Sequence, residues 1–234
     1  MVDHALISLQ SISRIYGLGD AKVKALDDVS LAIRSGEFVA VMGPSGSGKS
    51  TALNVIGSLD TPTSGSYLFD GVEVAGLTKD QRALLRRHYL GFIFQGYNLL
   101  ARTSALHNVE LPLIYKGVRP AQRRKTAIDV LERVGLGERI HHDPSELSGG
   151  QQQRVAIARA MATKPRVILA DEPTGNLDSH MSRDIMEVLV ELNERDGMTI
   201  VMVTHEHDMA EYAQRLVWMV DGRIDSDTQM REAA

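Results

Sequence analysis

The sequence predicts an α/β fold in which helices cover a mostly parallel β-sheet. Short apolar runs recur along the chain, and amphipathic helical patterns separate them. Because these runs lack a regular alternation of polar and apolar residues, we expect strands that are covered on both faces, as in parallel sheets. The runs are EFVAVMG (37–43), GFIFQ (91–95), RVILADE (166–172), TIVMVTH (199–205) and RLVWMVDGRI (215–224).

The first part of the chain alternates polar and apolar residues more regularly, which predicts an antiparallel β portion. The alternating segments are LISLQSISRIYG, KALDDVSLAI and GSYLFDGVEV, and Gly or Asp turn signals separate them. Alternation of this kind is typical of strands with one buried and one solvent-facing side. We therefore expect a smaller antiparallel sheet near the N-terminus.

The strand signal lapses between Gln95 and Thr163, which predicts a helical subdomain at about residues 96–163. In the segment AQRRKTAIDVLERVG, the apolar residues recur on one side of a helix. The chain length falls within the range of one large domain. We expect residues 1–234 to form a single domain, with the helical subdomain inserted into the α/β core.

Composition and charge argue against nucleic-acid-binding, disulfide-stabilised and membrane-spanning proteins. The net charge is −4 and no strongly basic block is present, so nucleic acid is not expected as a partner. The absence of cysteine excludes a disulfide framework and fits the cytosol. The N-terminal segment MVDHALISLQSISRIYG lacks the pattern of a signal peptide, and no apolar run approaches the roughly 18–20 residues that span a bilayer. A role at a membrane would need a partner subunit.

The nonapeptide GPSGSGKST matches the phosphate-loop pattern and lies between a predicted strand and a predicted helix. Its glycines let backbone N–H groups wrap a phosphate at a helix N-terminus, where partial positive charge favours an anion. Lys49 supplies a cation to the outer phosphates, Ser50 is placed to bind Mg²⁺, and Thr51 to contact the inner phosphate. The core is therefore expected to have the P-loop NTPase fold. The candidate loop residues are Gly43, Pro44, Ser45, Gly46, Ser47, Gly48, Lys49, Ser50 and Thr51.

Two adjacent carboxylates, Asp171 and Glu172, end the predicted strand in RVILADEP. Neighbours on a strand point to opposite faces, so the two carboxylates are expected to have different roles. Asp171 is the candidate that organises Mg²⁺ beside the phosphate loop, and Glu172 is the candidate base that polarises an attacking water. A solvated acidic turn is the alternative for this pair taken alone, and the phosphate loop argues against it.

Three further side chains are candidates that have ordinary structural alternatives. His205 follows a predicted strand at the sheet edge where ligands of α/β sheets bind, and it is placed to hydrogen-bond a γ-phosphate. Gln95 is a candidate to reach Mg²⁺ or the attacking water, and Tyr16 to stack on a base. The alternatives are a structural histidine, a polar strand end and a packed tyrosine. The adjacent His141 and His142 are interpreted as surface residues.

The order of the motifs is GPSGSGKST, Gln95, LSGGQQQR, RVILADEP, GNLD and His205. This order resembles the nucleotide-binding subunit of ATP-binding cassette (ABC) transporters, and the resemblance covers almost the whole chain. It implies an ATPase with a RecA-like core that uses ATP and Mg²⁺. It also implies a homodimer in which two such domains dock head to tail and enclose two ATP molecules.

The resemblance assigns LSGGQ as the signature motif that completes the partner's site. It implies that residues Ser148, Gly149, Gly150 and Gln151 of one protomer face the γ-phosphate held by the phosphate loop of the other. The residues fit this role, because the glycine backbone, a serine hydroxyl and a helix N-terminus make an anion site without lysine. The resemblance further implies that GNLD, which ends at Asp178, joins the two sites, that Tyr16 stacks on adenine, and that Gln95 senses Mg²⁺ and a membrane partner.

Within that family, the segments FQGYNLLARTSALHNVELPLIYKG and DEPTGNLD are most similar to the macrolide-efflux and lipoprotein-releasing ATPases. This narrower resemblance implies a transmembrane permease, a periplasmic adaptor as a further candidate partner, and a location on the cytoplasmic face of the inner membrane. Because the chain ends at REAA, we expect the permease to be a separate subunit.

Three alternatives within the larger family differ in their partners. A cell-division ATPase would couple ATP to a peptidoglycan hydrolase through a membrane partner, and its motifs overlap with these. A relative that acts on DNA repair would carry a coiled coil or a zinc insertion, and a translation factor would carry two cassettes. The sequence shows none of these additions.

Overall fold

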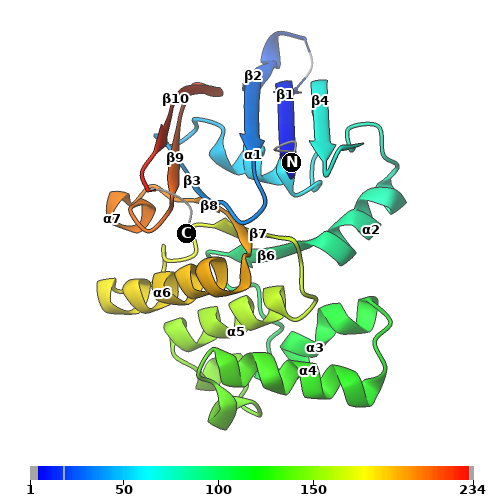
Figure 1. The fold of residues 1–234 in the computed structure, drawn as a ribbon, viewed down its shortest axis with the longest axis vertical. Coiled ribbons are helices and arrows are strands. Elements are labelled where there is room, and N and C mark those ends of the chain that lie inside the picture. The colour runs from blue at the N-terminus through cyan, green and yellow to red at the C-terminus, as the bar shows by residue number, and fades with distance from the viewer. Residues whose placement is uncertain (1–4, 18, 232–234) are drawn as a thin grey trace.

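The computed structural model describes residues 5–17 and 19–231, which include a six-stranded sheet with the order β10-β9-β3-β8-β7-β6 (Figure 1). Strands β9, β3, β8, β7 and β6 run parallel, and β10 pairs antiparallel with β9. The predicted α/β fold with a mostly parallel sheet is therefore confirmed. The strands are β3 (Phe38–Met42), β6 (Leu90–Phe94), β7 (Val167–Asp171), β8 (Thr199–Val203), β9 (Arg215–Val220) and β10 (Arg223–Gln229).

The central strands are buried on both faces, which explains their unbroken apolar runs. Every residue of β3 and β8 is buried. Successive side chains along a strand point to opposite sides, so one strand serves two cores. In β3, Ala40 belongs to the core beneath α6 (Ser179–Asp196), while Val39 and Val41 belong to the core beneath α1 (Lys49–Ile56).

The run at 215–224 forms two strands joined by a tight turn, so its interpretation as one continuous run is wrong. Asp221 and Gly222, at the turn, have φ values of 47° and 78°, in the left-handed region. An Asp-Gly pair is a favoured sequence for this kind of hairpin turn. The amide of Gly222 donates to the carbonyl oxygen of Ser47 at 3.1 Å, so the turn also packs against the glycine-rich loop.

The predicted antiparallel portion is confirmed as a four-stranded sheet with the order β2-β1-β4-β5. It lies at the top of Figure 1, above α1. The hydroxyl of Tyr67 donates to the carbonyl oxygen of Ile56 at 2.7 Å and so ties this sheet to the end of α1. The strands are β1 (Ile7–Tyr16), β2 (Val23–Ile33), β4 (Ser64–Phe69) and β5 (Val72–Glu73).

Helices occupy most of the region between β6 and β7. Helices α3 (Ala105–Tyr115), α4 (Pro120–Arg133) and α5 (Gly149–Met161) pack on one another at the bottom of Figure 1. Helix α5 also touches β6, where a Cβ on Gly91 would lie 2.8 Å from the carbonyl oxygen of Ala160. The inserted subdomain at 96–163 within a single domain stays a prediction. The short 3-10 helices are η1 (Gly19–Ala21), η2 (Gly137–Arg139) and η3 (Pro144–Glu146).

Helix α2 (Lys79–Tyr89) precedes β6 and lies outside the region where helices were predicted. It begins with a capping box in which Thr78 and Gln81 exchange side-chain and backbone hydrogen bonds. No residue of α2 is fully buried, and its half-buried side carries Arg82 and Arg86 beside Leu85, so the sequence shows no continuous apolar stripe. Among the described residues, no helix combines the length and apolar character that a bilayer crossing requires.

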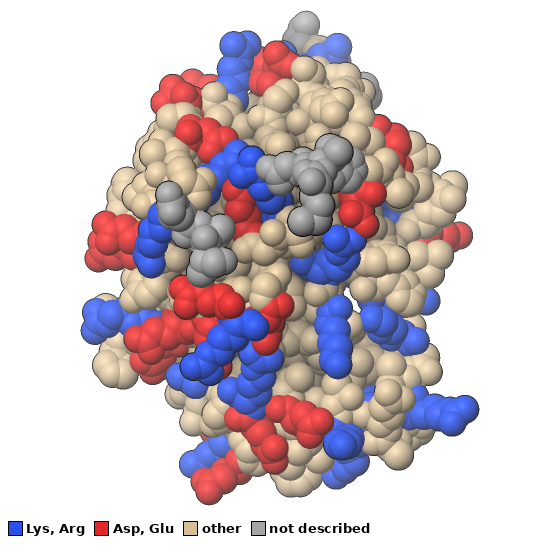
Figure 2. Space-filling view, viewed as in Figure 1, with Lys and Arg blue, Asp and Glu red and all other residues tan. Residues whose placement is uncertain are grey.

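Acidic and basic side chains are interspersed over the face of the molecule drawn in Figure 2. Several form exposed or half-exposed pairs, such as Arg195 with Glu191 at 2.7 Å and Arg133 with Asp196 at 2.6 Å. Exposed pairs of this kind contribute at most about 1 kcal/mol each. Stability therefore rests mainly on the two apolar cores.

Candidate functional site

The glycine-rich loop lies between β3 and α1, and its backbone requires glycine. Gly43, Gly46 and Gly48 have φ values of 145°, 80° and 97°. A Cβ on Gly43 would lie 2.0 Å from the carbonyl oxygen of Met219, so no larger residue fits there. The Nζ of Lys49 donates to the carbonyl oxygens of Gly43 and Pro44, both at 2.8 Å, which places the ammonium group over the loop.

The two carboxylates at the end of β7 contact different partners. The hydroxyl of Ser50 donates to Oδ1 of Asp171 at 3.4 Å, so Asp171 faces the start of α1. Glu172 contacts Nδ1 of His205 through Oε1 at 3.1 Å. Glu172 itself has a left-handed φ of 47°, which is unusual for a residue with a side chain. The two carboxylates therefore contact different partners, as predicted, but strand alternation is not the reason: β7 ends at Asp171, and the left-handed backbone of Glu172 turns its side chain toward His205.

A cavity of about 940 Å³ brings the loop, Glu172 and His205 together. Its wall also includes Trp218 of β9 and Lys24 of β2, neither of which the sequence singled out. Their place depends on the packing of β2 and β9 beside the loop, for which the local sequence holds no signal. The loop residues that line the cavity are Gly43, Pro44, Ser45, Gly46, Gly48, Lys49, Ser50 and Thr51, whereas Ser47 is buried behind them.

The oxygens of Ser50 and Asp171 fit a magnesium ion. Mg²⁺ prefers oxygen ligands and commonly takes only one or two from the protein, with phosphate oxygens and waters completing its shell. Within residues 5–17 and 19–231, no group of three or more His, Cys, Asp or Glu side chains forms a self-sufficient metal site. A hydroxyl and a carboxylate beside a phosphate loop match a metal that is held jointly with a nucleotide.

Burial and the nearby charge of Glu172 raise the pKa of Asp171 above its ordinary value, although the Ser50 hydroxyl and Lys49 act in the opposite direction. A carboxyl group whose pKa is raised by folding binds its proton more tightly in the folded state. Its contribution to stability is present at low pH and is lost as pH rises through the folded pKa. At neutral pH, the charged Asp171 therefore opposes folding.

We expect Asp171→Asn to raise the thermal midpoint of the nucleotide-free protein at neutral pH, by on the order of 2–4 °C. The neutral amide removes the buried charge and can still accept the Ser50 hydrogen bond. Thermal unfolding followed from pH 3 to 8 measures the effect. The gain should shrink as pH falls, because Asp171 is then protonated in both states. A lower midpoint for the variant at neutral pH would contradict this assignment.

Two candidate residues lie outside the cavity wall. Tyr16 pairs with Val23 of β2, which does line the cavity, but the Tyr16 hydroxyl donates to Asp60 at 2.5 Å and the Arg14 guanidinium lies over its ring. The side chain of Gln95 lies against Gly175, where an added Cβ would be 2.7 Å from Nε2. Their roles in adenine and Mg²⁺ binding stay predictions.

The signature residues lie at the start of α5 and also line no part of this cavity. Ser148 caps the helix and exchanges hydrogen bonds with Gln151. An added Cβ on Gly149 would meet the Tyr97 hydroxyl at 2.8 Å, and one on Gly150 would meet Met181 at 2.9 Å. Both glycines thus lie close to side chains of their own chain, and a larger residue at either position would displace Tyr97 or Met181.

Asp178 begins α6 as its N-cap and accepts hydrogen bonds from the amides of His180 and Met181 at 3.0 and 2.9 Å. In the same region, the Asn176 amide donates to the carbonyl oxygen of Gln95 at 2.9 Å. The segment GNLD thus connects β6 with α6 within one chain.

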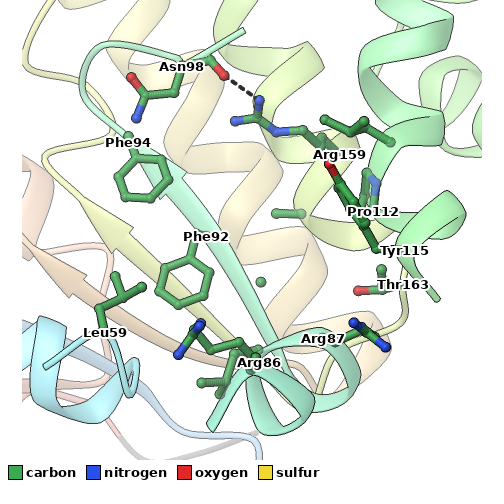
Figure 3. A pocket seen from close by; sticks show the side chains of 15 residues that line it. Leu59, Arg86, Arg87, Phe92, Phe94, Asn98, Pro112, Tyr115, Arg159 and Thr163 are labelled. Atoms are coloured by element: carbon green, nitrogen blue, oxygen red, sulfur yellow. Dashed lines mark hydrogen bonds between the residues drawn. The ribbon is translucent and has the colours of Figure 1, made fainter. Parts of the chain in front are cut away.

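A second cavity, of about 610 Å³, lies between β6 and helices α2, α3 and α5 (Figure 3). Phe92 and Phe94 of β6 stack in parallel, with ring centroids 5.9 Å apart, and form part of its apolar wall. The local sequence gives no signal for this groove, because one of its walls is α2, which was not predicted. The arginines that line it are Arg86, Arg87 and Arg159, and none of the described residues in its lining is a carboxylate.

The family model described as "ABC transporter" matches residues 26–175. The macrolide export ATP-binding/permease protein MacB of Hyphomonas neptunium is 52% identical over 229 residues, which cover 98% of this chain and 35% of that protein. MacB of Brucella melitensis is 50% identical, with 99% and 36% covered. The chain thus spans about a third of the length of these relatives.

The fold is also similar to solved structures. A dimeric post-hydrolysis structure of the ATP-binding cassette MJ0796, bound to ADP and Pi, has a TM-score of 0.89 and 45% identity, and the match covers 97% of this chain and 99% of that chain. That the permease is a separate subunit stays a prediction, since this chain spans only about a third of relatives that are named ATP-binding/permease proteins.

Proposed function

The chain belongs to the ABC transporter family, and from this premise we propose that it is the ATP-hydrolysing part of an exporter of the macrolide-efflux type. The observation that carries the proposal is the single cavity that joins the Lys49 loop with Glu172 and His205. Relatives named macrolide export proteins, about 50% identical over nearly the whole chain, support the exporter class.

The residues of the cavity suit a direct attack of water on the γ-phosphate of ATP. Loop amides and Lys49 hold the phosphates and balance their charge. Glu172 accepts the proton of the attacking water, and His205, 3.1 Å from its carboxylate, holds that oxygen in place. When bound to Ser50 and Asp171, Mg²⁺ supplies additional positive charge at the phosphates.

We further propose that hydrolysis takes place in a head-to-tail homodimer. The anion-binding features of Ser148 to Gln151 lie at the start of α5, apart from the cavity of the same chain. A second copy would bring them to the γ-phosphate and so complete the site. The similarity to a dimeric ATP-binding cassette, over 97% of this chain, supports this arrangement.

The groove at β6 is proposed as the docking site for a short helical segment of the permease. Its aromatic wall suits an apolar side chain, and its three arginines without a lining carboxylate suit an acidic one. The groove is lined by β6, the strand that leads to Gln95. Movement of the bound permease segment can therefore shift Gln95 and affect the nucleotide site. This contact would hold the chain on the cytoplasmic face of the membrane. A periplasmic adaptor, on the other side of the membrane, is a further candidate component of the complex.

Tyr115 lines the groove and is 64% exposed, so it is available to a partner. We expect Tyr115→Ala to weaken capture of the co-expressed, detergent-solubilised permease at least tenfold, because aromatic residues often carry about 2 kcal/mol of binding energy in such contacts. ATP hydrolysis by the isolated chain should not change. The matched control is Val72→Ala, since Val72 is 61% exposed on β5 and lies outside the groove. Equal capture by both variants would exclude the groove.

Release of phosphate from ATP by the purified chain, with and without Mg²⁺, tests the proposed activity. Mg²⁺-dependent release that increases more than linearly with protein concentration is the expected result, because the complete site needs two copies. A chain that binds ATP but releases no phosphate at any concentration would contradict the proposal.

A further inference from the structure

Gln153 is a fully buried polar residue in the first turns of α5. The three glutamines of LSGGQQQR make three different hydrogen bonds. Gln151 accepts from the amide of Ser148, and Gln152 donates to the carbonyl oxygen of Leu147 at 3.0 Å. Both bonds join residues of the signature segment, whereas the side chain of Gln153 bonds to a residue outside it.

The amide of Gln153 donates to the carbonyl oxygen of Pro173 at 2.6 Å, between residues 20 positions apart in the sequence. Pro173 directly follows Glu172. The backbone amide of Glu172 donates to the carbonyl oxygen of Val203 in β8 at 2.9 Å. The backbone around Glu172 is therefore fixed to β8 on one side and to α5 on the other.

This attachment matters because Glu172 holds a left-handed backbone conformation, with a φ of 47°. For a residue other than glycine this conformation costs about 1–2 kcal/mol and persists only where the surroundings enforce it. The hydrogen bonds at Val203 and Pro173 are such constraints. Loss of the bond at Pro173 would let the peptide after Glu172 rotate and would shift its carboxylate relative to His205.

The side chain of Gln153 buries a polar oxygen whose hydrogen-bonding capacity is not used within the described chain. Its Oε1 is buried and has no hydrogen-bond partner among residues 5–17 and 19–231. An apolar side chain of similar size would remove that unpaired oxygen, but it would also leave the carbonyl oxygen of Pro173 without its donor. The amide of Gln153 therefore serves the backbone that follows Glu172 rather than the packing of its own side chain.

We infer that Gln153 is a positioning residue that connects the signature segment to the base Glu172. The inference rests on the proposed ATPase function. In the proposed dimer, Ser148 to Gln151 contact the nucleotide held by the partner, while Glu172 acts on the nucleotide held by its own chain. The bond from Gln153 to Pro173 therefore couples the two sites: closure of α5 on one nucleotide orders the base at the other.

The test replaces Gln153 with methionine, which keeps the length of the side chain and removes its donor. We expect kcat for ATP hydrolysis to fall about ten- to hundredfold, with KM and ATP binding within about twofold of the wild type. In a Glu172→Gln background, the same change should alter the residual rate less than about twofold, because a residue that acts through Glu172 has nothing left to position. Hydrogen exchange should be faster at residues 172–177 and unchanged in β3.

The matched control is Asn193→Leu, which also removes a buried amide that donates to backbone carbonyls, those of Gly36 and Met198, away from the cavity. It should lower the thermal midpoint without changing kcat. If Gln153→Met does not fold, Gln153→Leu carries the same comparison. Wild-type kcat in the folded variant, or equal effects with and without Glu172, would overturn the inference. Absence of hydrolysis in the wild type would instead refute the proposed function.

Discussion

Replacement of Glu172 by glutamine is expected to lower kcat about a thousandfold, the middle of the range for loss of a general base. Glutamine has nearly the same shape and can still hydrogen-bond with His205, which lies 3.1 Å from the carboxylate. It cannot accept a proton from water, so only the chemical step should be affected. ATP binding and ATP-dependent dimerisation should be retained. Single-turnover phosphate release, measured beside equilibrium ATP binding, separates these steps.

Glu206→Gln is the control for this substitution. Glu206 accepts a hydrogen bond from Thr174 at 3.0 Å, and a glutamine can accept the same bond. It follows His205 in the sequence but does not line the nucleotide cavity. This variant should hydrolyse ATP at the wild-type rate. Wild-type turnover by Glu172→Gln itself would remove Glu172 as the base.

Replacement of Ser148 by arginine is expected to reduce hydrolysis at least a hundredfold, while the isolated chain still binds ATP. The long cation would occupy the space where the signature segment meets the partner's γ-phosphate, and the loss of a preorganised hydrogen-bond donor to a phosphate has an effect of this size. Because Ser148 does not line the cavity of its own chain, ATP affinity at low protein concentration should not change. Equilibrium binding and steady-state hydrolysis measure the two effects.

The control for Ser148→Arg must account for its helix cap, because loss of an N-cap costs about 1 kcal/mol. Ser104 caps α3 in the same way and accepts from the amide of His107 at 3.3 Å. Ser104→Arg should therefore destabilise the protein to a similar extent and leave hydrolysis intact. Full-rate hydrolysis by monomeric Ser148→Arg would refute a site shared between two chains.

Much of the fold is predictable from the sequence because local signals and tertiary structure agree. The apolar runs predict the parallel sheet because β3 and β8 are buried on both faces. The hairpin at Asp221 and Gly222 was missed, although its Asp-Gly turn is a recognisable signal. Helix α2 was missed for a different reason: its half-buried side contains Arg82 and Arg86 beside Leu85, so no apolar periodicity marks it.

The site is only partly predictable, for reasons of packing. Strand alternation predicts that Asp171 and Glu172 face different partners. The partners do differ, but β7 ends at Asp171 and Glu172 owes its direction to a left-handed backbone that no local pattern encodes. The cavity wall brings Lys24 and Trp218 together from distant parts of the chain. The hydrogen bond from Gln153 to Pro173 likewise joins two separate segments. No periodicity or motif encodes such contacts. The signature glycines illustrate the same limit, because their contacts with Tyr97 and Met181 become visible only in the folded chain.

The central claim is that each active site is built from the phosphate loop of one chain and the signature segment of another. A mixture of two inactive variants, Lys49→Ala and Ser148→Arg, tests it most directly. In a mixed dimer, the Ser148→Arg chain contributes its intact loop and Glu172, and the Lys49→Ala chain contributes its intact Ser148. Half of randomly formed dimers are mixed and each has one complete site, so independent sites would recover roughly a quarter of the wild-type rate. With the coupling inferred through Gln153, the account predicts clear recovery below that level, because the Glu172 in use belongs to the chain whose signature segment is altered. A mixture no more active than its separate components, at any ratio, would contradict it.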